Sequence, residues 1–505
     1  MGRLGAGLGA ACGVGAAALG AGAVLASVGG RDWRGHAVRP VPERWPGGPA
    51  AYLQADRRRR MAAILLTWLV NLMLTEKNPL PLVGVKGALA AACWRLAGGS
   101  GSFRLAVLAF DILSSSALLA EYVWRPWEAL GAAEAALREA GLPAGPSPEA
   151  ACAAGDGGGE KEGLTVGGLE DLMGRVSPLE MLLGRALLPS RKAPGGRGGT
   201  AAVQIIRDVP YASAAEQAEA GAQAAELRVD VRFTLETQRA GGRPVLLYIH
   251  GGAWLKGMGD KNGYGPLEPA APEFFAERGW VTCSMDYRLV NSRKTEAGSR
   301  WPAMLVDVKR CIRWIRGNIE QFGGRPDWVA VCGGSAGGHL AILAGMLTGP
   351  EYQPGFEDVD TGVRAVVSYY PAVDTLEPVA TKILHGDGRE RCGAEAPAAE
   401  AERERASPLH LVSRCPVPAT FPRIMVIQGS RDALCPTPKC RLFVELLRQR
   451  LAHAGRRGVD DRVCYLELPR GRHAFDVIHG VRTWCSLLAA NRFLTQRFEA
   501  TLKEA

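Results

Sequence analysis

The sequence predicts an α/β protein built on a mostly parallel, doubly wound sheet of eight strands. After residue 200, short apolar runs alternate with helical stretches, which is typical of a sheet covered by helices on both faces. Most of these runs are continuously apolar, as expected for strands buried on both sides. The expected strands are residues 203–207, 227–234, 244–249, 279–285, 328–332, 364–369, 423–428 and 462–467.

Helical stretches are expected between the later strands, over residues 301–320, 336–347, 440–454 and 480–499. The first two strands have no convincing helix between them, and this favours an antiparallel start to the sheet. Two Ala/Glu-rich pieces, residues 213–226 and 393–405, are interpreted as surface insertions.

Residues 1–125 are expected to form an apolar N-terminal membrane region, either with two to four spans or as a signal or anchor segment. Its three main apolar runs are 61–75, 80–94 and 105–121, each shorter than the roughly 20 residues that a spanning helix prefers. A soluble helical subdomain is the alternative. Residues 5–28 fit a signal peptide, a weak spanning helix or a transit segment equally well. The chain is therefore expected to be membrane-associated, with Arg57–Arg60 on the cytoplasmic side.

Residues 126–200 are expected to be a linker with cap-like helices, and 201–505 a catalytic domain. Helical spacing appears in residues 127–142 and again in 168–187, separated by a Gly/Pro-rich stretch. How residues 165–200 and the insertion at 386–406 cover the pocket of this domain should decide which substrates it accepts.

Charge and cysteine content exclude several classes of function. The net charge of +9 is spread along the chain without aromatic–basic interleaving, so no nucleic-acid partner is expected. Twelve cysteines lack the spacing of a zinc site, and Cys283 and Cys332 should be buried in strands. A disulfide between Cys435 and Cys440 stays open. No metal or cofactor site is predicted, and Gly-rich residues 195–199 lack a P-loop lysine.

The strongest motif is Gly-Gly-Ser-Ala-Gly at residues 333–337, which follows an expected strand and opens an expected helix. A serine on such a sharp turn projects its hydroxyl above the sheet, which makes Ser335 a candidate nucleophile. The turn needs small neighbours, because side chains at Gly333 and Gly337 would collide.

A second motif, His-Gly-Gly-Ala-Trp at residues 250–254, ends the third expected strand. Acyl transfer places negative charge on the former carbonyl oxygen, and backbone N–H groups of a Gly-rich turn can hold that charge. The predicted donors of this oxyanion hole are Gly251, Gly252, Ala253 and Ala336. An ordinary glycine turn is the alternative.

A serine needs a base, and His473 follows the eighth expected strand, where it can reach across the top of the sheet. His479 is the less favoured candidate, and His339 should point away inside the helix that follows Ser335. The other histidines, His36, His385, His410 and His453, have no supporting context.

The base needs an orienting carboxylate, and Asp432 follows the seventh expected strand. Asp374, after the sixth strand, is the more serious rival. Asp476 is disfavoured because it lies too near His473 in sequence to approach Nδ1.

These motifs resemble the α/β-hydrolase superfamily, and HGGAW with GGSAGGHLA is similar to its hormone-sensitive-lipase-like and feruloyl/acetyl-esterase-like branches. Stretches at 285–289, 301–316, 323–341, 352–363 and 472–477 resemble actinobacterial carboxylesterases with apolar N-terminal regions. The resemblance covers roughly residues 165–497. Many hormone-sensitive-lipase-like members read HGGG, so Ala253 puts the backbone angles of that turn in question, and AGRRGVDD at 454–461 looks like a loop insertion.

The resemblance implies ester hydrolysis through an acyl-enzyme, with Ser335 as nucleophile, His473 as base and Asp432 as acid, in the chain order expected of this fold. A small-molecule or lipid ester is the expected substrate. Three alternatives stay open: a kynurenine-formamidase-like amidohydrolase, a prenylcysteine methylesterase, and a membrane-tethered binding protein without turnover.

Overall fold

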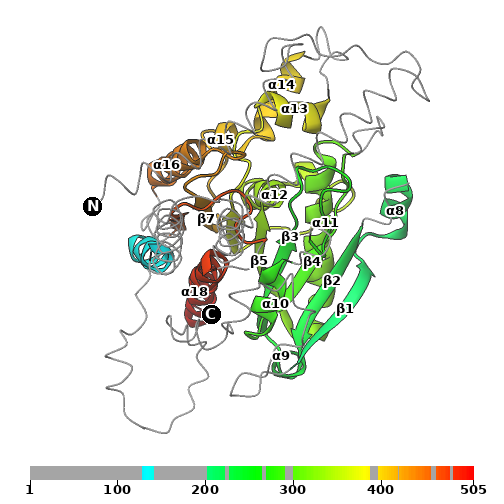
Figure 1. Cartoon of the computed structure of the whole chain (residues 1–505). Helices are drawn as coiled ribbons and strands as arrows, with labels where there is room; N and C mark the ends of the chain where they lie inside the picture. The colour runs from blue at the N-terminus through cyan, green and yellow to red at the C-terminus, as the bar shows by residue number, and fades with distance from the viewer. Residues whose placement is uncertain are drawn as a thin grey trace, which may run out of the picture. The chain divides into compact units, whose positions relative to one another are not determined.

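An eight-stranded sheet forms the centre of the part of the chain that the computed structural model describes (Figure 1). The described residues are 128–141, 202–221, 227–263, 269–290, 299–386, 396–418, 420–455, 462–477 and 481–504. The strands are β1 Val203–Pro210, β2 Arg228–Thr234, β3 Arg243–Ile249, β4 Val281–Met285, β5 Gly324–Gly334, β6 Ala365–Tyr369, β7 Arg423–Gly429 and β8 Val463–Leu468. Each of the eight expected ranges overlaps one of them.

The strand order is β1-β2-β4-β3-β5-β6-β7-β8. β2 pairs antiparallel with both β1 and β4, and every other neighbouring pair is parallel. The prediction of a mostly parallel, eight-stranded sheet with an antiparallel start is therefore confirmed. Because β3 and β5 are neighbours, Ile249 and Gly333 stand opposite each other, so the two Gly-rich motifs leave the sheet side by side.

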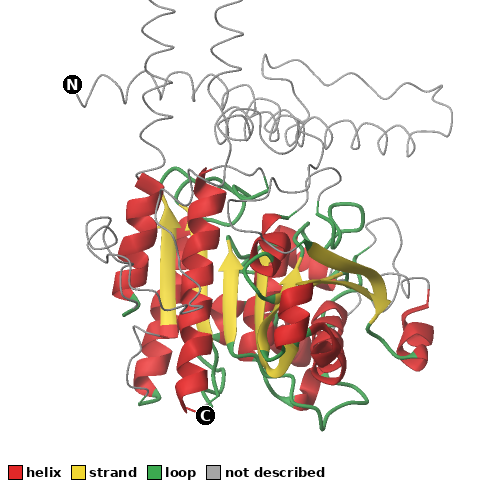
Figure 2. Ribbon diagram, turned by 90° about the horizontal axis from the view of Figure 1, so that it is seen from below, coloured by secondary structure: helices red, strands yellow, loops and turns green. Residues whose placement is uncertain are grey.

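Helices cover the sheet on both faces (Figure 2). They are α8 Ala214–Ala220, α9 Leu235–Ala240, α10 Ala270–Ala276, α11 Ala303–Asn318, α12 Ala336–Met346, α13 Pro378–His385, α14 Ala396–Arg405, α15 Pro408–Leu411, α16 Thr437–His453 and α18 Val481–Glu504, with 3₁₀ turns η4 Ile319–Phe322 and η5 Pro350–Tyr352. α10 packs on α18, and α11 packs on α12. The four helical stretches expected from the sequence correspond to α11 with η4, α12, α16 and α18.

The core follows from the apolar spacing of these elements. α11 buries Met304, Leu305, Val308, Ile312 and Ile315, which recur three and four residues apart and so share one helix face. β5 to β7 bury every residue of their central runs, as strands with helices on both sides must. Cys283 and Cys332 are buried within strands, and Cys435 and Cys440 are free thiols rather than a disulfide.

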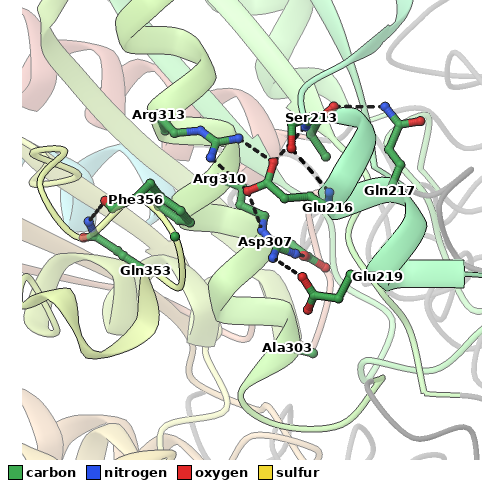
Figure 3. A network of polar contacts seen from close by, with 12 residues as sticks. Ser213, Glu216, Gln217, Glu219, Ala303, Asp307, Arg310, Arg313, Gln353 and Phe356 are labelled. Atoms are coloured by element: carbon green, nitrogen blue, oxygen red, sulfur yellow. Dashed lines mark hydrogen bonds and ion pairs between the residues drawn. The ribbon is translucent and has the colours of Figure 1, made fainter.

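α8 lies in the piece interpreted as a surface insertion, yet it is fixed to the body of the protein (Figure 3). Ser213 and Glu216 form a reciprocal capping box that starts the helix. The Glu216 carboxylate also pairs with Arg310 Nε at 3.0 Å and Arg313 Nη2 at 2.6 Å, both on α11. Glu219 pairs with Arg310 Nη2 at 2.8 Å. The piece is thus a surface element that ion pairs hold against α11.

α14, in the second piece interpreted as a surface insertion, is also held by contacts with the body of the protein. Its Glu402 accepts a hydrogen bond from Trp301 Nε1 at 2.7 Å and another from the Tyr352 hydroxyl at 3.1 Å. The carbonyl of Ala406, just after the helix, accepts from the Thr375 hydroxyl at 3.0 Å. These contacts tie the end of the insertion to the body of the protein beside the sheet.

Residues 128–139 form the described helix of the expected linker region, coloured cyan in Figure 1. Glu139 pairs with Arg448 of α16 at 2.8 Å, and Glu128 pairs with Arg470 after β8 at 3.3 Å. The remaining expectations for 1–127 and for 168–187 lie outside the described residues. Within the described ranges, no helix combines the length and apolar character that crossing a bilayer requires.

Candidate active site

Ser335 occupies the turn between β5 and α12, with φ 57° and ψ −118°. A Cβ added at Gly337 would lie 2.0 Å from the carbonyl oxygen of Ile249, and one added at Gly333 would lie 2.6 Å from the Gly337 backbone. Both positions therefore require glycine, as the sequence indicated. Ser335 is partly exposed, although the residues on either side of it in the turn are buried. The fold thus presents one hydroxyl at the end of the central strand.

His473 lies within hydrogen-bonding distance of both Ser335 and Asp432. Its Nε2 is 2.9 Å from Ser335 Oγ, and its Nδ1 is 2.8 Å from Asp432 Oδ2. The three side chains come from loops that follow β5, β8 and β7, which end at the same edge of the parallel sheet. The structure brings together all three residues that the sequence singled out, in the arrangement that general-base activation of a serine needs.

The loops that carry Asp432 and His473 are joined by backbone hydrogen bonds. The N–H of Ser430 donates to the Leu468 carbonyl at 3.0 Å, and that of Arg431 donates to the Gly471 carbonyl at 2.8 Å. Asp432 Oδ1 accepts from the N–H groups of Leu434 and Cys435, both at 2.9 Å. One carboxylate oxygen is therefore held by the backbone, which leaves the other directed at His473.

Two opposing influences act on the His473 imidazole. Burial lowers its pKa, because a buried ring loses the solvation of its charged form. The neighbouring Cys435 and Asp432 side chains act against burial and raise the pKa of His473 above its ordinary value of 6.5. The site therefore favours the protonated, imidazolium form of His473.

The turn after β3 contains the expected oxyanion donors Gly251, Gly252 and Ala253. Gly252 has φ 113°, while Ala253 and the next residue, Trp254, have φ 52° and 58°. Ala253 thus adopts a left-handed conformation that glycine ordinarily occupies, which answers the question raised by its departure from HGGG. The turn begins beside α12, where Ala336 is the first helical residue.

His250 and Tyr287 fix the start of that turn. The Tyr287 hydroxyl donates to the His250 carbonyl at 2.9 Å, and the two rings stack at 4.4 Å. His250 Nδ1 lies 2.7 Å from the Gly251 carbonyl oxygen. Burial lowers the pKa of His250, so its ring stays neutral and Nδ1 can donate to that carbonyl.

The rival acids have other partners. Asp374 pairs with Lys439 at 2.8 Å and accepts the N–H of Leu376. Asp476 accepts a hydrogen bond from the Tyr370 hydroxyl, and burial raises the pKa of its carboxyl. Neither carboxylate occupies the position beside His473 Nδ1 that Asp432 fills.

The other described histidines lie away from Ser335 Oγ. His339 points to the Ala406 carbonyl at 2.7 Å, His410 Nδ1 lies 2.9 Å from Ser407 Oγ, and His453 Nδ1 lies 2.7 Å from the Gln449 carbonyl. His385 ends α13. His36 and His479 lie outside the described residues.

Two neighbours of His473 were not found from the sequence. The Tyr370 ring lies 4.8 Å from the His473 ring, and Tyr370 has φ 34°. The Cys435 side chain, in the loop that carries Asp432, interacts electrostatically with His473. Tyr370 directly follows β6, so its place at the carboxyl end of a strand was a usable signal. Nothing in the sequence distinguishes Cys435 from the buried cysteines.

Comparison with known proteins finds esterases. The BD-FAE family model matches residues 231–447. The probable carboxylic ester hydrolase LipM of Mycobacterium tuberculosis is 35% identical over 265 residues, which are 51% of this chain and 55% of that protein. Esterase LipC of the same organism is 38% identical over 261 residues, 50% of this chain and 58% of that protein. The matched region thus spans little more than half the length of either relative.

Among solved structures, esterases are found at low similarity. Esterase B from Lactobacillus rhamnosis superposes with a TM-score of 0.45 at 18% identity, over 64% of this chain and 93% of that one.

Proposed function

Because the chain belongs to the α/β-hydrolase carboxylesterase family, we propose that it is a serine hydrolase that cleaves carboxylic esters through an acyl-enzyme. One observation carries the proposal: the His473 ring contacts Ser335 Oγ with one nitrogen and Asp432 Oδ2 with the other, at 2.9 and 2.8 Å. A serine hydroxyl is a weak nucleophile at neutral pH, and this arrangement supplies the base that activates it.

In the first half of the reaction, Ser335 Oγ attacks the ester carbonyl carbon while His473 Nε2 accepts the hydroxyl proton. Asp432 holds the ring so that Nε2 is free to accept, and its negative charge stabilises the imidazolium. The tetrahedral intermediate then expels the alcohol, which takes its proton from His473. The acyl group remains on Ser335 as an ester.

The oxygen of the tetrahedral intermediate carries a negative charge that backbone N–H groups must stabilise. We assign this role to Gly251, Gly252 and Ala253, together with Ala336 at the start of α12. The support is their placement: a Cβ at Gly337 would lie only 2.6 Å from the His250 carbonyl oxygen, so the Gly-rich turn and the start of α12 are in contact. The positive end of the α12 dipole adds to the same effect.

In the second half, a water molecule attacks the acyl-enzyme while His473 takes its proton. The same donors hold the second oxyanion, and the carboxylic acid leaves as His473 returns the proton to Ser335.

Ester hydrolysis is favoured over the amidohydrolase and non-catalytic alternatives, because LipM and LipC are named for ester hydrolysis. Neither of these names identifies the alcohol or the acyl group of the substrate. A prenylcysteine methyl ester would be one particular substrate of the proposed chemistry.

The proposal is tested with the full chain, a fluorophosphonate probe and p-nitrophenyl esters of increasing acyl length. Ser335→Ala should lose probe labelling and lower kcat by more than about 10³-fold. Ser413→Ala is the matched control, since its hydroxyl donates only to the His410 carbonyl in a surface turn. Wild-type protein that neither labels nor turns over any ester, or faster turnover of N-formylkynurenine than of esters, would overturn the proposal.

We also propose that residues 1–125 attach the catalytic domain 201–505 to a membrane through the intervening segment 126–200. The support is in the sequence: three apolar runs follow Arg57–Arg60 within 65 residues. Carbonate extraction of membranes from cells that express the full chain should leave the protein in the pellet. Release into the supernatant would contradict the proposal.

A further inference from the structure

His339 is a buried histidine that the proposed reaction does not use, although it lies one helical turn beyond Ser335. Its N–H donates to the Ser335 carbonyl at 2.9 Å, and its side chain is fully buried. Burial lowers the pKa of His339 to about 4, so the ring is neutral at physiological pH. In that form, Nε2 carries the proton that it donates to the Ala406 carbonyl, 2.7 Å away. The ring thus links the nucleophile helix α12 to the end of the insertion that contains α14.

The same ring packs against Trp254, the residue that ends the oxyanion turn. The two ring centroids are 5.1 Å apart with an interplanar angle of 84°, an edge-to-face contact. Within the described residues, the buried Nε1 of Trp254 has no hydrogen-bond partner. The orientation of the Trp254 ring therefore depends on packing, and His339 provides one side of that packing.

The oxyanion turn needs such support because its backbone is strained. Ala253 and Trp254 are consecutive non-glycine residues with φ 52° and 58°. Left-handed conformations of this kind cost roughly 1 kcal/mol or more each, and they persist only where surrounding contacts hold them. Loss of the contact beside Trp254 would let the turn relax and move the N–H group of Ala253.

The contacts continue from His339 to α14. Trp301 packs on His339 at 6.2 Å and on Tyr352 at 5.6 Å. Both Trp301 Nε1 and the Tyr352 hydroxyl donate to Glu402 of α14. A continuous set of aromatic rings, Tyr352, Trp301, His339 and Trp254, therefore joins α14 to the oxyanion turn.

We propose that His339 is a positioning residue for the oxyanion hole, and that the insertion ending at Ala406 acts on catalysis through it. This inference rests on the proposed serine-esterase function. His339 touches no reacting atom; it holds Trp254 and hence the turn whose N–H groups stabilise the oxyanion. Its loss should weaken binding of the transition state while leaving binding of the substrate nearly unchanged.

The test compares His339→Leu and His339→Phe with Thr375→Val on a p-nitrophenyl ester. Thr375→Val removes a hydrogen bond to the same Ala406 carbonyl but leaves the ring contact with Trp254 in place. His339→Leu should lower kcat by about 10- to 100-fold with KM changed less than about threefold, as expected for a displaced oxyanion donor. His339→Phe, which restores a ring against Trp254, should recover most of that loss, and Thr375→Val should stay close to wild type.

Fluorophosphonate labelling rates should follow the same order, because phosphonylation also places charge in the oxyanion hole. Equal losses in His339→Leu and Thr375→Val, or a rise in KM at unchanged kcat, would overturn the inference. If His339→Leu does not fold, Glu402→Ala replaces it, with Glu404→Ala as control, since Glu404 pairs with Arg414 instead. Wild-type protein without turnover or labelling would refute the proposed function, whereas an active wild type with unaffected variants would refute only this inference.

Discussion

His473 Nδ1 lies 2.8 Å from Asp432 Oδ2, although 40 residues separate the two in sequence. β7 and β8 are parallel neighbours, with Gly429 paired to Leu468, so the loops that follow them emerge together. The contact is thus a product of strand pairing.

Asp432→Asn should lower kcat by about 10³- to 10⁴-fold, because the amide favours the wrong tautomer of His473. The melting temperature should change little. Asp374→Asn is the matched control, since Asp374 pairs with Lys439 rather than with His473. Steady-state kinetics on one p-nitrophenyl ester measures kcat for both variants. A larger loss of kcat in Asp374→Asn than in Asp432→Asn would show that Asp374 is the residue that orients His473.

The kcat/KM should rise with pH through the pKa of His473, because only a neutral ring can accept the proton of Ser335. Burial lowers this pKa, but Cys435 and Asp432 raise it above 6.5. Cys435→Ala removes one of the two side chains that raise the pKa of His473. The acid limb of the kcat/KM profile should therefore move to lower pH by roughly 0.5 to 1 unit.

The control for that pH profile is Cys440→Ala. The Cys440 thiol lies 3.3 Å from Gln428 Oε1, and its removal should leave the acid limb in place. An acid limb that is unmoved or shifted upward in Cys435→Ala would show that the thiol does not act on His473.

Glu216→Gln should lower the free energy of unfolding by about 2 to 4 kcal/mol at pH 7. The buried Arg310 guanidinium would then lose the negative charge of its Glu216 partner. Burial alone would raise the pKa of Glu216, but hydrogen bonds from Arg313 and Ser213 lower it to about 2. Its stabilisation is therefore present above pH 4.5 and is lost as the pH falls towards 2.

Urea denaturation at pH 7 and pH 3 measures the effect of Glu216→Gln. Glu219→Gln serves as the control, since that exposed partner of Arg310 should contribute less than about 1 kcal/mol. Similar losses of unfolding free energy in both variants would mean that the buried Glu216 pair stabilises the fold no more than the exposed Glu219 pair.

Because of Lys309, the free energy of unfolding should rise with pH between about 8 and 10.5. The buried ammonium donates to the carbonyl of Gly349, to Gln353 Oε1 and to Thr361 Oγ1 at 3.1 to 3.3 Å. Burial lowers its pKa to about 8, against 10.5 in the unfolded chain. Unfolding therefore takes up a proton between these values, so stability rises with pH there.

Lys309→Met removes this titration, and the comparison cancels the ionisation of buried thiols and phenols in the same range. The unfolding free energy of the wild type minus that of the variant should increase by up to about 3 kcal/mol between pH 8 and 10.5. A difference that stays flat across this range, in chemical denaturation at several pH values, would contradict the assigned pKa.

The sequence by itself determined the elements of the fold and the chemistry-bearing residues at their ends. All eight strands were predictable, because runs buried on both faces must be continuously apolar. Ser335, His473 and Asp432 were predictable because each follows such a strand. The Gly-rich turn at 250–254 was predictable because two consecutive glycines come directly after an apolar strand.

Only the tertiary structure decided which of these ends meet and what supports them. The position of β3 beside β5 places Ile249 opposite Gly333, and no local pattern encodes that pairing. Glu216 and Glu402 looked like surface residues because their arginine and aromatic partners lie 50 or more residues away in sequence. His339 and Tyr370 gain their neighbours in the same way: contacts between segments far apart in sequence form only when the sheet and helices pack, since burial depends on the whole fold.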